Sequence, residues 1–161
     1  LKLVDSYQAQ QKALMPAIKA LTPDPKTGKT LLSLGPVQNK KYEILNAAGR
    51  STVKSRAYEN LKSAVDTAVN IQVSAEKGVQ TDRDVLRFAN ALIGAYGKND
   101  TKATLEALQR FNSAVKDAEV KTKQVIESRR KSQGVRSYYG GETPATEATT
   151  PKRVKFMDLP K

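Results

Sequence analysis

The apolar residues of this chain recur mostly three and four positions apart, the spacing of an α-helix that buries one face. The first such segment runs from about residue 5 to 21 and places on one face Tyr7, Leu14, Ile18 and Leu21. Pro16 interrupts it, because proline lacks a backbone N–H and its ring clashes with the carbonyl of Lys12. The sequence therefore predicts a kinked helix or two short helices here.

A second and a third helix are predicted over the next part of the chain. Pro36 is typical of a first helical turn, and the short helix it opens has on one face Val37, Lys41 or Tyr42, Leu45 and Ala48. Residues 51–77 carry a longer stripe, made of Ala57, Leu61, Ala64, Val65, Ala68, Ile71 and Ala75. A competing strand-like alternation runs from Val65 to Val73. We favour a helix, because the alanines extend the stripe on both sides and no turn residue precedes Gly78.

Helix-start residues precede two further predicted helices. Thr81 is placed to cap the first, with Asp82 and Asp84 near the positive end of its dipole. The second is the longest element and extends from about residue 101 to 133. Its apolar positions have the spacing of a coiled-coil seam, and the candidate assembly residues on it are Leu108, Phe111, Val115 and Val125.

The acidic residues of the longest helix are placed to pair with basic residues one turn later. Four such pairs have the acid first: Glu106–Arg110, Asp117–Lys121, Glu119–Lys123 and Glu127–Lys131. This spacing indicates that the acids support a solvated face of the helix. Arg129, Arg130 and Lys131 suit the negative end of the helix dipole.

The fold class predicted from these patterns is all-α and extended, with one long C-terminal helix and a flexible C-terminal tail. We divide the chain into an N-terminal helical segment (1–49, with a loop at 22–35), a helical core (50–134), and a linker with a docking peptide (135–161). The linker is rich in Gly, Thr and Pro and has nothing to bury. The peptide after it is expected to dock on a partner or a sister subunit, or else on its own domain, through Val154, Phe156, Met157 and Leu159.

The composition limits both the core and the chemistry of this protein. Among its 161 residues, 39% are hydrophobic and 6% aromatic, so its core must come mainly from Ala, Val, Leu and Ile. We expect such narrow apolar stripes to be incomplete by themselves and to be buried against another molecule. Cys and His are absent, which excludes thiolate and imidazole metal sites and any reaction that uses a His base. The chain begins with Leu1, so we expect a processed or partial piece of a longer protein.

The net charge of +12 points to anionic partners. The excess of Lys and Arg over Asp and Glu is five in residues 1–50, one in 51–100 and six in 101–161. Nucleic acid, an anionic membrane surface and an acidic protein are therefore all candidate partners. The candidate contacts with phosphate or acidic groups are Arg129, Arg130, Lys131, Arg136, Lys152 and Arg153.

One stretch, TPDPKTGKT at 22–30, ends like a phosphate-binding loop. Its first glycine position holds Pro23, a helix is predicted before it, and Gly35-Pro36 stops any helix soon after it. We therefore interpret it as a surface turn, and Asp82 with Asp84 as a helix start. No catalytic, cofactor-binding or metal-binding residue is predicted, and the protein is expected not to be an enzyme.

Part of the chain resembles virion proteins of tailed bacteriophages. The resemblance rests on GVQTDRDVLRFANAL at 78–92, on NDTKATLEAL at 99–108 and on the basic helix that follows. It is similar to internal, DNA-ejection or tail-associated components, with Gly78, Thr81, Asp82 and Asp84 matching their helix-start pattern. The resemblance implies a multi-copy structural subunit of the virion that binds itself and other virion proteins, in a ring or conduit that DNA passes through. The alternative is a basic helical protein that binds nucleic acid without sequence specificity.

Overall fold

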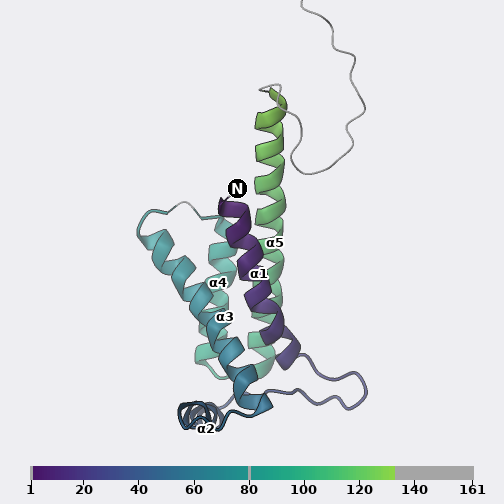
Figure 1. Ribbon diagram of the computed structural model, residues 1–161, viewed down its shortest axis with the longest axis vertical. Coiled ribbons are helices and arrows are strands. Elements are labelled where there is room, and N and C mark those ends of the chain that lie inside the picture. Colours follow the sequence, from purple (N-terminus) through teal and green to yellow (C-terminus); the bar gives the residue numbers. More distant parts are fainter. Residues whose placement is uncertain (1, 80, 133–161) are drawn as a thin grey trace, which may run out of the picture. The chain divides into compact units, whose positions relative to one another are not determined.

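A computed structural model describes residues 2–79 and 81–132 of the chain and confirms an all-helical fold. No strand occurs within those ranges. The helices are α1 (Lys2–Leu21), α2 (Pro36–Ala47), α3 (Val53–Glu76), α4 (Arg83–Gly97) and α5 (Thr101–Ser132). Residues up to Val125 form one compact unit, in which α1, α3, α4 and the first part of α5 run alongside one another (Figure 1). Helix α2 lies at one end of these helices.

The ends of the helices follow from capping side chains and from glycines. Thr52 and Ser55 exchange side-chain and backbone hydrogen bonds in a capping box that starts α3. Asp82 caps α4 by accepting a hydrogen bond from the backbone N–H of Asp84, so the cap is Asp82 and not the expected Thr81. After α3, Gly78 adopts a φ of 80°, a left-handed conformation that glycine reaches without strain.

Helix α1 is continuous through Pro16, where two short helices were one of the expected outcomes. Both Lys12 and Pro16 are exposed, so the proline, which deprives the Lys12 carbonyl of its helical hydrogen bond, lies on the solvent side of the helix. On the other face, Leu14 and Ala17 are completely buried. Burial on both sides of the proline therefore holds the two halves of the helix together.

The core residues of the compact unit are buried within a single copy of the chain. Helix α3 contacts α1, α2 and α4. The stripe predicted for α3 is buried from Ala57 to Ile71, which confirms the helix over the strand. Alanines from α1, α3, α4 and α5 fill much of the core and allow the helices to approach closely. The expectation that the stripes need another molecule is wrong for these core positions.

Candidate protein-interaction surface at the basic end

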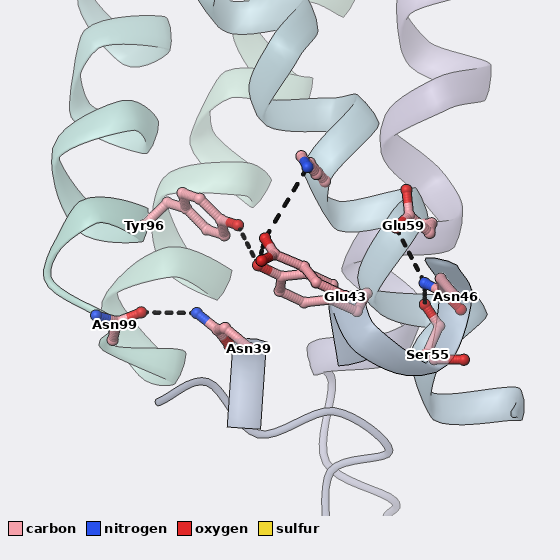
Figure 2. A network of polar contacts seen from close by, with 9 residues as sticks. Asn39, Glu43, Asn46, Ser55, Glu59, Tyr96 and Asn99 are labelled. Atoms are coloured by element: carbon pink, nitrogen blue, oxygen red, sulfur yellow. Dashed lines mark hydrogen bonds and ion pairs between the residues drawn. The ribbon is translucent and has the colours of Figure 1, made fainter. Parts of the chain in front are cut away.

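Helix α2 is attached to the rest of the unit through its polar face. Asn39 donates a 2.7 Å hydrogen bond to Asn99, which lies in the turn between α4 and α5. One turn later, Glu43 lies 3.9 Å from the ammonium group of Lys62 on α3. After another turn, Asn46 donates hydrogen bonds of 3.0 Å to the carbonyl of Ser55 and to the carboxylate of Glu59. These contacts, drawn in Figure 2, fix the rotation of α2 about its own axis.

Two tyrosines complete this attachment from the buried side. The rings of Tyr42 and Tyr58 pack with their centroids 5.5 Å apart. The hydroxyl of Tyr58 lies 2.8 Å from that of Tyr96 and donates a 3.4 Å hydrogen bond to Glu43. The pKa of the Tyr58 phenol is strongly raised. The largest cause is burial, and the neighbouring Tyr96 and Glu43 raise it further. Tyr58 therefore stays neutral, and its contacts with Glu43 and Tyr96 hold α2, α3 and α4 together.

The opposite side of α2 presents apolar and basic side chains to solvent. Val37 and Ile44 lie two turns apart on one face, and they are 78% and 61% exposed. Lys40 and Lys41 are exposed beside them. We call these four residues the α2 outer face. The face predicted for this helix is therefore only partly correct: Tyr42 is buried and Leu45 is half-buried, whereas Val37 and Ala48 are exposed.

The loop at residues 22–31, which connects α1 toward α2, is closed by its own hydrogen bonds. The backbone N–H of Leu32 donates to the carbonyl of Ala20, which ties the two ends of the loop together. Asp24 accepts hydrogen bonds from the backbone N–H groups of Lys26 and Thr27, at 2.7 and 3.2 Å. Its carboxylate thus takes up donors that a phosphate would need. The interpretation of this stretch as a surface turn is supported by the structure.

A groove of about 760 Å³ lies between this loop, the end of α1 and the start of α3. Lys19, Lys29 and Arg56 line it, and Asp24 is the single acidic residue in its lining. Apolar lining comes from Pro16, Ala20, Pro23, Pro25, Leu31, Val53 and Ala57. We call this the basic groove. Residues 19–56 as a whole carry eight basic and two acidic side chains, so this end of the unit is its basic end.

The assembly residues predicted on α5 have two different locations. Leu108, Phe111 and Val115 are completely buried in the chain's own core, where they already have partners. Val125 is 50% exposed. A seam for another copy therefore cannot use the first three, which is a correction to the predicted site.

The predicted basic contacts and the docking peptide fall at or beyond the end of α5. Arg129, Arg130 and Lys131 occupy the last turn of that helix, as predicted from its dipole. The remaining predicted residues lie outside the described part of the chain: Arg136, Lys152, Arg153, Val154, Phe156, Met157 and Leu159.

Sequence reasoning missed one buried polar contact between α1 and α5. Glu119 is only 7% exposed and accepts hydrogen bonds from Gln8 at 2.9 Å and Gln11 at 2.6 Å. Lys123 pairs with it at 2.6 Å, as the spacing predicted. The hydrogen bond from Lys123, and after it the one from Gln8, lowers the pKa of Glu119. Lys121, expected to pair with Asp117, lies instead 3.7 Å from Asp82. Acids on α5 thus tie helices together as well as support its solvated face.

The described residues contain no group of three or more acidic side chains placed to hold a metal ion. Within the same ranges, no helix is both long and apolar enough to cross a membrane. No family model, curated protein or solved structure gives a significant match to this chain.

Proposed function

We propose that this protein is a structural subunit of a bacteriophage virion and acts by assembling with further copies of itself and with other virion proteins. The virion context rests on the resemblance of residues 78–133 to virion proteins of tailed phages. The mode of action rests on α2, whose polar face is turned inward and whose apolar Val37 and Ile44 are turned outward. In this proposal the subunit is not an enzyme and uses no cofactor.

The orientation of α2 carries this proposal because it leaves two large apolar side chains, Val37 and Ile44, exposed to solvent. A surface helix normally buries its apolar stripe and exposes its polar residues, since that removes apolar area from water. Here Asn39, Glu43 and Asn46 make polar contacts with the rest of the unit, while Val37 and Ile44 are exposed. The exposed α2 outer face gains from burial against another molecule, at roughly 25 cal/mol for each Å² of apolar surface covered.

Replacing both Val37 and Ile44 with serine is expected to abolish self-association. Sedimentation velocity over a range of concentrations should show the unchanged chain forming larger species as concentration rises, while the double variant stays monomeric. The matched control replaces Val69 and Val73 on α3, which are 37% and 39% exposed, and should associate like the unchanged chain. A chain that remains monomeric at every concentration, or a double variant that associates normally, would contradict the proposal.

Non-specific binding of nucleic acid is a second candidate function, favoured by the eight basic side chains between residues 19 and 56. An assembly subunit should bind duplex DNA only weakly, and the binding should disappear by about 200 mM salt. Such binding is driven by the release of counterions from the DNA, which added salt opposes. A salt titration of DNA binding, followed by fluorescence anisotropy, checks this expectation. Tight binding that persists above that salt concentration would favour the nucleic-acid binder.

A further inference from the structure

We propose that the basic groove binds an acidic segment of a partner protein, one that carries aliphatic side chains between its carboxylates. The inference rests on the proposed function only in treating the chain as a protein-binding subunit. It adds a second surface, separate from the α2 outer face, and specifies the chemistry of the partner.

The charges of the groove select an anionic ligand. Lys19 on α1, Lys29 on the loop and Arg56 on α3 approach the same space from three different elements. Asp24 is the acidic residue of the lining, and its carboxylate is already engaged by backbone N–H groups of the loop. Three cations on separate elements match carboxylates spaced along a bound segment, because each cation can pair with a different carboxylate.

The apolar lining favours a protein segment over a nucleic acid. Leu31 is 42% exposed and Val53 is 64% exposed, and both line the groove beside the buried Ala57. Such aliphatic surface is suited to Leu, Ile or Val side chains from a partner. Nucleic acids bound as single strands are normally held by aromatic side chains that stack on the bases. The lining of the basic groove contains no aromatic residue.

The groove is held in shape before any ligand arrives. The hydrogen bond from Leu32 to Ala20 closes the loop, and Leu32 itself is completely buried. Thr22 adds a 2.7 Å hydrogen bond from its hydroxyl to the carbonyl of Ile18. A wall fixed in this way loses little conformational entropy on binding, which favours affinity. The volume of about 760 Å³ lies within the usual range for ligand sites.

The chain's own C-terminal peptide is a poor occupant for this groove. Residues 152–159 contain Lys152, Arg153 and Lys155 against a single acid, Asp158. Like charges would meet if this peptide entered a groove lined by Lys19, Lys29 and Arg56. The cationic lining thus favours an acidic segment of another protein over this basic peptide.

Binding is tested with a fluorescein-labelled synthetic peptide built from glutamate, leucine and glycine, followed by fluorescence anisotropy on the full chain. The double variant Lys19→Glu with Arg56→Glu is expected to weaken binding about tenfold or more. The matched control reverses Lys12 and Lys102, two exposed lysines outside the groove, and removes the same net charge. That control should bind nearly as well as the unchanged chain.

A second pair of variants tests the apolar part of the inference. Leu31→Ser with Val53→Ser should weaken peptide binding about tenfold, while Val69→Ser with Val73→Ser should leave it unchanged. Equal losses in the groove variants and their controls would overturn the proposal. So would a groove that binds a labelled poly-thymidine oligonucleotide but not the peptide. The Val37 and Ile44 double variant should still bind the peptide, so failure of self-association and failure of the groove are separate results.

Discussion

Replacing Phe111 with alanine is expected to lower the free energy of unfolding by about 4 kcal/mol. The side chain of Phe111 is completely buried in the core of the compact unit, so the substitution removes a large apolar group and leaves a cavity. Small domains have a total stability of only about 5–15 kcal/mol, so the loss is a large share of the total. Urea denaturation followed by circular dichroism measures it.

This experiment also separates a core residue from an assembly residue. Replacing a residue that is buried in its own chain lowers the free energy of unfolding equally at every protein concentration. Replacing a residue at a seam between copies weakens association instead. Val125, predicted on the same seam but 50% exposed, provides the matched control. Its replacement with alanine should change the free energy of unfolding by less than about 0.5 kcal/mol. If Phe111→Ala abolished association and left the denaturation midpoint unchanged, the buried location would be contradicted.

Replacing Glu119 with glutamine is expected to cost about 2 kcal/mol of stability at neutral pH. The carboxylate accepts hydrogen bonds from Gln8, Gln11 and Lys123, and a neutral amide cannot accept all of them. The amide group would also direct its own N–H donors toward other donors. Thermal and urea denaturation measure the loss. Glu106→Gln, on an exposed position of the same helix, is the control and should cost less than about 0.5 kcal/mol.

The pH dependence of this effect follows from the lowered pKa of Glu119. A carboxyl group with a lower pKa in the folded state stabilises the fold fully at pH values above its ordinary pKa of 4.5. The contribution declines as the pH falls below that value and passes through the pKa of the folded state. The stability difference between the unchanged chain and Glu119→Gln should therefore shrink in acid. A difference that stays constant down to the acid transition would contradict a charged Glu119 as its source.

Local features of the sequence were enough to predict most of the helices. The stripe from Ala57 to Ile71 was correctly predicted as a helix, and Asp82 and Asp84 were correctly predicted as a helix start. Such features depend on residues within a few turns of one another, which the printed sequence shows directly.

The missed contacts join residues that are distant along the chain. Glu119 was predicted to pair with Lys123 one turn away, but its bonds to Gln8 and Gln11 span more than a hundred residues. The orientation of α2 was missed for the same reason, since its inner polar residues depend on Asn99, Lys62 and Glu59. The periodicity of a short helix alone does not show which face will find polar partners. The basic groove likewise forms only when three separate elements meet.

The polar attachment of α2 holds this helix at one angle to the rest of the compact unit. Among its residues only Tyr42 is buried, and the other contacts join hydrogen-bonding groups that water can also satisfy. Tilting the helix would exchange bonds with the protein for bonds with solvent, at about 1 kcal/mol for each bond. Because these costs add up across the contacts of Asn39, Glu43 and Asn46, a partner meets Val37 and Ile44 on a helix that is already held in one orientation.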